Sequence, residues 1–553
     1  MHTVMLFLRG WRRVVALCLC AALAATAALA QTPPAGALPA LGDAGDMTPP
    51  QERRLGDVIV RDLYNDPSYM DDPVIGEYVD GAWRRLLAGA QARGDLTPEL
   101  AGRYAWRFAL VRDREINAFA MPGGYLGLNL GLIGAVDSRD ELAAVLAHEM
   151  SHIVQRHIAR MIARQSREQP LLLAAMAAGI LAGMRNPQVA SAVIAGGQAT
   201  AAARELKFSR DMEREADRVG YGVFVQSGFA QWGFASMFEK LQAAARINDN
   251  GDWPLLRSHP LTTERIADAQ ERQRGLQGRP KPAPDGEALL IAARARVLAQ
   301  PGVDVLRGWA RAPESADFVK QPAEKRAAAL YAAALSQAAL RDLPKAQSLA
   351  AQLVTLAAGD AKAARQAALL QAELALRARQ PARALQLLPA GDAGAATASA
   401  TPVEISDAGN NAQGSAGNGN ADPSHVSFAG RAALLLRAEA QLQTGATEQI
   451  KPAASALQTW TSLHPEDALA WQRLAQTNRA LGLELRALRA EGEARMANLD
   501  YAGAIDRWRA AQDYSRQHQS AAYDLIEASI VNVRLRAAQE ALKRQQETEK
   551  KFD

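Results

Sequence analysis

The second half of the chain constrains the fold most, because it contains little that could form a β-strand. From about Asp285 to the C-terminus the sequence is rich in Ala, Leu, Arg and Gln, with apolar residues at helical spacing. Aromatic residues make up only 5% of the 553 residues, which favours packed helices over a large β-sandwich. We therefore predict helical hairpins over 285–553, and more than one hydrophobic core in a chain of this length.

Short recurring segments indicate that these hairpins are repeats. Leu343-Pro344-Lys345-Ala346 and Gln380-Pro381-Ala382-Arg383-Ala384 each follow a helical stretch, and their last alanines lie 38 residues apart. This spacing is near the roughly 34-residue tetratricopeptide period. The segments Leu499–Ala504 and His464–Ala468 are of the same type. An irregular helical bundle is the alternative, because the repeats are degenerate.

Two segments have the composition of unstructured polypeptide. Residues 31–50 are rich in proline and small residues, and residues 390–427 hold too few apolar side chains to pack. We predict a linker over 31–50 and a disordered insert at about 390–427 inside the repeats. Residues 51–280 between them form the predicted catalytic domain, with one β-like stretch from Asn117 to Leu130.

The first thirty residues have the pattern of a secretory signal peptide. Three arginines precede an apolar run that ends in Ala28-Leu29-Ala30. We predict cleavage near Ala30 and export to the periplasm, with an uncleaved membrane anchor as the alternative. Removing three arginines from the 63 basic residues leaves 60 against 59 acidic residues, which gives no reason to expect a nucleic-acid partner. Both cysteines also lie in this segment, so a metal site must use His and carboxylate.

A metal-binding motif lies in an apolar stretch of the catalytic domain. His148-Glu149-Met150-Ser151-His152 places two histidines four residues apart, on one face of a predicted helix. Both imidazoles can reach one zinc ion, and Glu149 beside them can act as the general base. A pair of structural histidines is the alternative.

The third ligand of such a zinc site must be His, Asp or Glu, because a catalytic zinc takes three protein ligands and one open position. The segment Ser209–Gly220 is helix-like and has Glu213 and Asp217 on one face, with Glu215 pointing roughly the opposite way. Only one face of this helix can point toward the metal. The ligand is therefore either Glu213, with Asp217 behind it, or Glu215. A solvated charged helix is the alternative.

Together these motifs resemble the gluzincin-type zinc metallopeptidases, the family of the CAAX prenyl proteases, the heat-shock membrane protease and the periplasmic β-barrel assembly-enhancing proteases. Two more segments share the resemblance, Asn117–Tyr125 ahead of the metal helix and Ser258-His259-Pro260 after it. The likeness covers roughly residues 51–275. The signal peptide and the repeats point to the periplasmic branch.

The resemblance implies a mainly α fold with a small β-sheet, in which a metallopeptidase domain is followed by tetratricopeptide-like repeats. It implies one zinc ion per chain, with Glu213 as the third ligand and Asp217 as a residue that supports a ligand. It also implies an edge strand on which an extended substrate pairs through its main chain. The residues of that strand are Asn117, Ala118, Phe119 and Ala120. A β-hairpin with Gly123-Gly124 at its turn is a compatible alternative.

His259 has three possible roles. It could stabilise the oxyanion of the tetrahedral intermediate, or it could occupy the open zinc position and gate the enzyme. A surface or helix-capping histidine is the third alternative. We favour the gate, since a protease among unfolded envelope proteins needs restraint.

The sequence departs from the integral-membrane relatives. The longest apolar run after the signal, Leu171 to Met184, is 14 residues, short of the roughly 17–25 needed to span a bilayer. We expect a buried or lid helix there, and peripheral membrane contact by residues 171–203 is an open alternative.

We therefore expect a periplasmic zinc metalloendopeptidase that degrades misfolded or stalled envelope proteins and assists outer-membrane protein assembly, meeting the assembly machinery through the repeats. The alternative is a chaperone or scaffold that acts chiefly through the repeats, with minor proteolysis. A membrane-anchored prenyl-type protease is disfavoured, because spanning helices are missing.

Overall fold

The computed structural model describes residues 47–164, 209–246, 259, 262–276, 278, 282–388, 430–518 and 522–552. Four predictions fall on residues outside these ranges: the signal peptide, the linker up to residue 46, the apolar stretch 171–203 and the disordered insert. Within the described ranges, no helix has both the length and the apolar character needed to cross a membrane.

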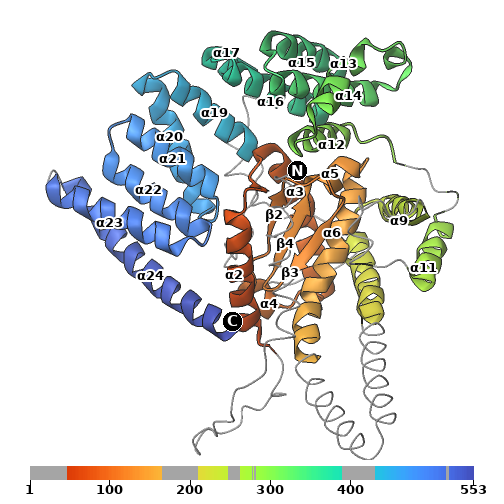
Figure 1. Cartoon of the computed structure of the whole chain (residues 1–553), viewed down its shortest axis with the longest axis horizontal. Coiled ribbons are helices and arrows are strands. Elements are labelled where there is room, and N and C mark those ends of the chain that lie inside the picture. The colour runs from red at the N-terminus through yellow and green to blue at the C-terminus, as the bar shows by residue number, and fades with distance from the viewer. Residues whose placement is uncertain are drawn as a thin grey trace, which may run out of the picture. The chain divides into compact units, whose positions relative to one another are not determined.

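A four-stranded sheet lies at the centre of the N-terminal half (Figure 1). Its order is β1-β2-β4-β3, with β2 and β4 parallel and the two outer pairs antiparallel. All five residues of β4 are buried, as expected for a central strand, and among the described residues β3 pairs only with β4 and forms an edge. The strands are β1 Tyr69–Met70, β2 Arg107–Val111, β3 Ala118–Met121 and β4 Tyr125–Asn129.

Strands β3 and β4 form the hairpin predicted over residues 117–130. Its turn contains Gly123 and Gly124, whose φ angles of 73° and 87° favour glycine. A Cβ atom at Gly124 would lie 2.7 Å from the Cβ of Tyr104, so the turn also needs glycine for space. The edge strand and the hairpin are thus both present.

The prediction of a single β-like stretch was wrong, because β1 and β2 were missed. β2 is held mainly by its parallel pairing with β4, a partner that follows it by 18 residues, and β1 has only two residues. Neither shows a local strand pattern. The predicted linker also ends earlier than residue 50, because Pro49 and Pro50 form the first turn of α2, where a missing N–H has no cost.

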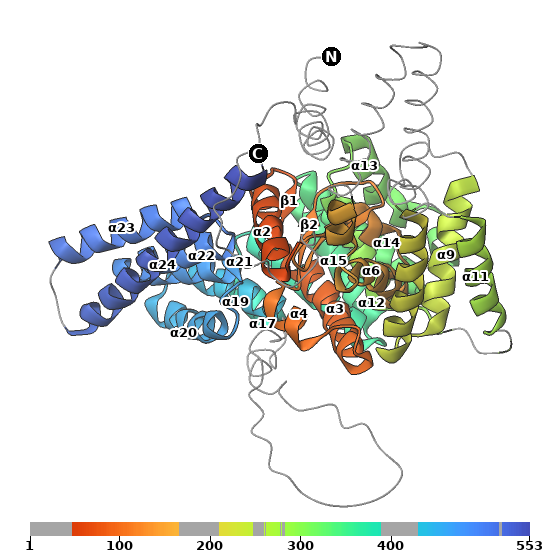
Figure 2. The same ribbon diagram turned by 90° about the horizontal axis from the view of Figure 1, so that it is seen from below.

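Helix α6 crosses the sheet and carries the HExxH motif. Ser138 caps its N-terminus by accepting a hydrogen bond from the backbone N–H of Glu141, and 14 of its 16 residues are buried. Helix α9 packs against α6, and Figure 2 shows α11 on the other side of α9. The helices of this half include α2 Pro49–Asn65, α3 Pro73–Arg93, α4 Pro98–Arg103, α5 Leu130–Ala135, α6 Arg139–Val154, α9 Gln231–Arg246 and α11 Thr263–Arg274. A further helix is described at residues 209–226.

Antiparallel helices follow from residue 286, where the composition of the sequence changes. One turn recurs in this array: Arg341, Arg379 and Leu499 each have a positive φ of 57–70°. At each of these turns, the next residue's N–H donates to the carbonyl five positions earlier. These are the positions of three predicted repeat segments. The helices are α12 Gly286–Leu298, α13 Val303–Arg311, α14 Ala323–Ala339, α15 Leu343–Ala357, α16 Ala361–Arg377, α17 Pro381–Leu387, α19 Arg431–Gln443, α20 Thr447–Leu463, α21 Ala468–Ala480, α22 Glu484–Ala497, α23 Tyr501–Gln517 and α24 Ala522–Phe552, with 3₁₀ turns η1 Ala312–Glu314 and η2 Phe318–Lys320. The mainly α fold with a small sheet is confirmed.

The helical array and the sheet region share one hydrophobic core. Buried residues of α12, α16, α17 and α19 belong to the same cluster as those of α3, β4 and α6. Two buried arginines reinforce this contact beside α3: Arg431 pairs with Asp71 at 2.6 Å, and Arg294 pairs with Asp72 at 2.6 Å. The described chain from residue 47 is therefore one compact unit.

Candidate metal centre

Helix α6 brings its two motif histidines together on one face. The Nε2 atoms of His148 and His152 are 3.1 Å apart, and both side chains are almost buried. Glu149 is fully buried between α6 and the edge strand, where its Oε2 accepts a hydrogen bond from the backbone N–H of Ala120 at 3.0 Å. The motif thus places two imidazoles and one carboxylate at the edge of the sheet.

The helix at residues 209–226 turns Glu213 and Asp217 toward α6. The Oε2 of Glu213 is 3.3 Å from the Nε2 of His148, and its Oε1 is 3.5 Å from the Nε2 of His152. Asp217 lies behind His148, with its Oδ1 3.0 Å from the Nδ1 of that ring. Glu215 points away, toward His157 and Arg160. Of the two faces that the sequence left open, the structure places the Glu213 face at the histidines.

His259 lies in the same cluster, although it is more than 100 residues from α6 in the sequence. Its Nδ1 is 2.9 Å from the Oε1 of Glu213 and 3.3 Å from the Nε2 of His148, and its Nε2 is 3.5 Å from the Oε1 of Glu149. It is thus neither a surface histidine nor a helix cap.

The spacing of these four side chains fits a single tetrahedral cation. Zinc–nitrogen bonds of about 2.0–2.1 Å place tetrahedral ligand atoms roughly 3.3–3.4 Å from one another. The separations above run from 2.9 to 3.5 Å, and the ligand atoms of all four residues lie within 4.8 Å of one another. Three nitrogens and one carboxylate oxygen are also a donor set that zinc accepts.

Burial and neighbouring groups shift the pKa values of the site in different directions. Burial lowers the pKa of His148, but hydrogen bonds to Asp217 and Glu213 outweigh it and raise that pKa to about 10. Burial opposes the ionisation of Glu213, but hydrogen bonds from His148 and His259 outweigh it and hold its pKa well below the usual range. Burial lowers the pKa of His152, which favours the neutral ring that a metal ligand requires. Burial also raises the pKa of Glu149, as suits a carboxylate that must accept a proton.

Two residues of this region were missed in the sequence. Arg265 of α11 is buried and pairs with Asp217 at 2.6 Å and with the Oε2 of Glu213 at 2.9 Å. Its segment has the polar composition of an exposed helix, so no local signal marks it. His157 lies against the far side of the His152 ring. It follows His152 by five residues, a spacing that would put it on another face of a continuous helix.

The predicted substrate strand lies beside the cluster. Asn117 is buried just before β3, and its backbone carbonyl accepts from the N–H of Asn129 at 3.1 Å. Ala118, Phe119 and Ala120 follow on β3 itself, and Phe119 covers Gly127 on β4, where a Cβ atom would lie 2.1 Å from the ring. The Ala120 N–H on the unpaired edge points at Glu149.

A small cavity of about 30 Å³ adjoins the cluster. Four polar or charged side chains line part of it, those of His148, Glu149, His259 and Arg265. The rest of its lining is apolar and is formed by Ala144, Val145, Phe234, Met237, Phe238 and Leu241.

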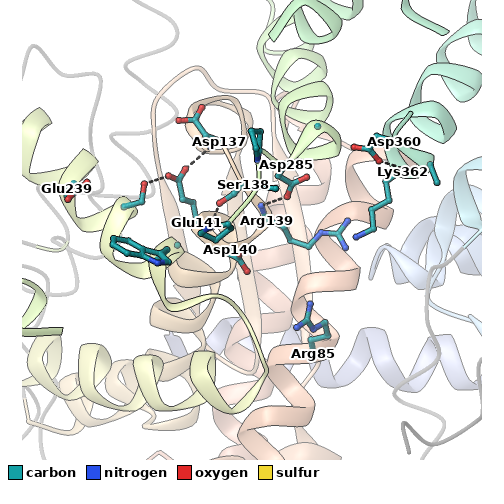
Figure 3. Close-up of a pocket in the computed structure, with 18 residues that line it drawn as sticks. Arg85, Asp137, Ser138, Arg139, Asp140, Glu141, Glu239, Asp285, Asp360 and Lys362 are labelled. Atoms are coloured by element: carbon teal, nitrogen blue, oxygen red, sulfur yellow. Dashed lines mark hydrogen bonds between the residues drawn. The ribbon is translucent and has the colours of Figure 1, made fainter. Parts of the chain in front are cut away.

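A larger cavity of about 760 Å³ lies at the opposite end of α6, where α6, α9, α12 and α16 begin (Figure 3). Two of the charged residues in its lining have the following contacts. Asp285 accepts from the backbone N–H of Arg139, whose side chain pairs with Glu287 at 2.7 Å. This cavity does not include His148, His152, Glu213 or His259.

Comparison with known proteins identifies the family. The sequence model of peptidase family M48 matches residues 92–273, a span that holds the whole cluster. A putative beta-barrel assembly-enhancing protease of Vibrio cholerae is 37% identical over 346 residues, which cover 61% of this chain and 67% of that protein. The chain belongs to peptidase family M48. The predicted resemblance is thus confirmed, and this M48 chain is a metallopeptidase.

Other relatives match over shorter spans. The beta-barrel assembly-enhancing protease of Escherichia coli is 35% identical over 268 residues, 47% of this M48 chain and 52% of that protein. The mitochondrial metalloendopeptidase OMA1 of Schizosaccharomyces pombe is 31% identical over 194 residues, 35% of this chain and 52% of that protein. The matched region thus spans about half the length of these two relatives.

Proposed function

We propose that this M48 peptidase is a zinc-dependent endopeptidase of the periplasm that cleaves unfolded or misassembled envelope proteins and assists the assembly of outer-membrane proteins. The observation that carries the catalytic part is the grouping of His148, His152, Glu213 and His259, whose ligand atoms lie within 4.8 Å of one another, next to the buried Glu149. The part concerning the outer membrane rests on the two relatives named for β-barrel assembly.

In this proposal, His148, His152 and Glu213 hold one zinc ion per chain. Bound zinc polarises the peptide carbonyl and makes water more acidic. Asp217 accepts the Nδ1 proton of His148 and so presents the Nε2 lone pair of that ring to the metal. Glu149 takes the proton of the attacking water and delivers it to the leaving amine.

An extended substrate would lie along the unpaired edge of β3. Main-chain pairing reads extended backbone with little demand on sequence, which suits the cleavage of unfolded chains. Because the Ala120 N–H points at Glu149, a peptide paired there would have its carbonyl next to the general base.

His259 would occupy the fourth position around the metal in the resting enzyme and gate it. Its Nδ1 lies at tetrahedral distances from both His148 and Glu213. A substrate carbonyl would then have to displace it. The oxyanion role would require the imidazole to turn from the ligand atoms toward the substrate.

The experiment uses the purified full chain. We expect about one zinc ion per chain, casein cleavage that a chelator abolishes, and recovery of cleavage when zinc is restored. Mass determination of the exported chain should give an N-terminus at Gln31. A chain that cleaves casein at full rate without zinc would refute the metal assignment, and a periplasmic form that retains residues 1–30 would refute the cleavage site.

A chaperone role for the helical array is the second candidate, favoured by the shared core that fixes this array to the sheet region. Glu149→Gln, which should not cleave, separates the two. If the variant still prevents aggregation of an unfolded outer-membrane protein as well as the wild type does, the array has a function of its own. If protection disappears with cleavage, proteolysis accounts for both.

A further inference from the structure

The turn that ends α6 contains a strained residue next to the metal centre. Helix α6 ends at Val154, and Arg156 then adopts a φ of 54°, in the left-handed region. Residues other than glycine adopt this conformation infrequently, and they keep it where the surrounding structure enforces it. The Nε of Arg156 donates to the Oε2 of Glu52 at 3.0 Å, which fixes the turn.

The consequence of the turn is the placement of His157. In an unbroken helix, residue 157 would lie about 140° around the axis from residue 152 and could not reach it. After the turn, the Nδ1 of His157 lies 2.9 Å from the Nδ1 of His152. His157 is only 2% exposed, so water does not compete for this contact.

Glu215 completes a chain of three side chains. Its Oε2 lies 3.2 Å from the Nε2 of His157 and 2.8 Å from the guanidinium of Arg160, which keeps the carboxylate in place. The chain thus runs from His152 through His157 to Glu215. His148 is supported differently, because its Nδ1 contacts the carboxylate of Asp217 directly at 3.0 Å.

The contacts select one arrangement of protons. A carboxylate only accepts, so a neutral His157 must carry its proton on Nε2 and donate it to Glu215. The Nδ1 of His157 is then an acceptor, and His152 must donate its own proton from Nδ1. This leaves the Nε2 lone pair of His152 pointing into the cluster, as a metal ligand requires. The opposite tautomer would place a proton of His152 where the metal binds.

We propose that His157 is a positioning residue, which accepts the Nδ1 proton of His152 and thereby presents the Nε2 of His152 to the metal, while Glu215 fixes the tautomer of His157. The positive-φ turn at Arg156 brings His157 into this position. This inference rests on the proposed zinc site. It also assigns a role to Glu215, which lies on the face of its helix that points away from the metal site.

The test measures zinc affinity of the full-length chain by competition with a chromophoric chelator. His157→Phe keeps a buried ring but removes both hydrogen bonds, so we expect zinc to bind about 10–100-fold more weakly, the usual cost of losing such a partner. His157→Gln offers an amide oxygen to the His152 proton and should lose less than 10-fold. Glu215→Gln still accepts the His157 proton and should bind zinc nearly as the wild type does, whereas Glu215→Leu should lose affinity.

The matched control is His464→Phe, the same substitution at a fully buried histidine that stacks on Trp460 in the helical array. It should leave zinc affinity unchanged. Thermal unfolding of each metal-free variant separates loss of fold from loss of metal, and His157→Gln carries the test if His157→Phe does not fold. Wild-type zinc affinity in the folded His157 variants would overturn the inference and leave the proposed function standing. A wild-type chain that binds no zinc would overturn the proposed function itself.

Discussion

The metal centre depends on a close approach of two helices at Gly220. This residue lies one turn after Asp217, and a Cβ atom there would lie 2.9 Å from the carbonyl oxygen of Ala147 and 3.0 Å from the Oγ of Ser151. Both neighbours belong to α6, on either side of His148. Replacing Gly220 therefore pushes the helix that carries Glu213 away from the helix that carries the histidines.

The size of the effect follows from opposing contributions. Gly220→Ala gains roughly 0.5–1 kcal/mol of helix stability. Overpacking against the main chain of α6 costs about 1–3 kcal/mol, so we expect a net loss of stability of up to about 2 kcal/mol. Gly220→Val should lose more. Because Glu213 and the histidines meet at 3.3–3.5 Å, a shift of even half an ångström should lower zinc affinity and reduce cleavage about 10-fold.

Gly222→Ala is the control on the same helix. Its Cβ would meet the guanidinium of Arg93 at 2.5 Å, the far end of a flexible side chain that can move aside. This variant should be as stable as the wild type or slightly more stable, and fully active. The assays are thermal unfolding with and without zinc, zinc titration and kcat/KM on casein. Wild-type zinc affinity and activity in Gly220→Val would refute the reasoning.

Three further predictions concern single groups. Glu213→Gln should lose most of its zinc, as measured by metal content after dialysis, and a variant with one zinc per chain would contradict the ligand assignment. His259→Ala should cleave casein faster and with less selectivity, because the gate is removed. A fall in kcat would instead support an oxyanion role for His259. Unchanged turnover with unchanged zinc affinity would exclude both the gate and the oxyanion role. Asp467→Asn should destabilise the chain by about 3–5 kcal/mol in chemical unfolding, because it leaves Arg431 buried without one of its carboxylates. Burial raises the pKa of Asp467, but the charge of Arg431 outweighs burial and lowers that pKa. The stabilisation by this ion pair is therefore present above the ordinary carboxyl pKa of 3.8 and is lost as the pH falls below it. An Asp467→Asn variant as stable as the wild type at pH 7 would show that the pair contributes nothing.

Local patterns predicted much of the fold and the site. The HExxH spacing specified one helical face, and α6 places His148 and His152 on that face. The residues of the turns also predicted the helical array. Gln380 and Pro381, for example, lie at the start of helix α17. These features depend on residues within a turn or two of each other, and the sequence displays them directly.

Other features depend on contacts between distant segments. Strand β2 exists because Phe108 and its neighbours pair with β4, which nothing in its own five residues reveals. The choice between Glu213 and Glu215 required knowing which face of their helix meets α6. In the sequence, Arg265 is one of several charged residues on a polar helix. Its role depends on the ion pairs with Asp217 and Glu213, which belong to another helix.

His157 shows a third kind of limit. If α6 continued as a regular helix, His157 would point away from His152. The positive φ of Arg156 breaks the helix and brings the two rings together. Arginine is not a residue that signals such a turn, since glycine and asparagine adopt it at lower cost. The contact is therefore visible only in the structure, where the Nδ1 atoms of the two rings lie 2.9 Å apart.

The central claim is that Glu149 is the proton acceptor of a zinc peptidase and not a metal ligand. The most direct measurement is zinc content and casein cleavage of full-length Glu149→Gln beside the wild type. Because Glu149 touches the Ala120 N–H and His259 but lies outside the cluster of ligand atoms, the amide should leave zinc bound. We expect about one zinc ion per chain and no detectable cleavage in this variant. Cleavage at the wild-type rate, or loss of zinc from the variant, would contradict it.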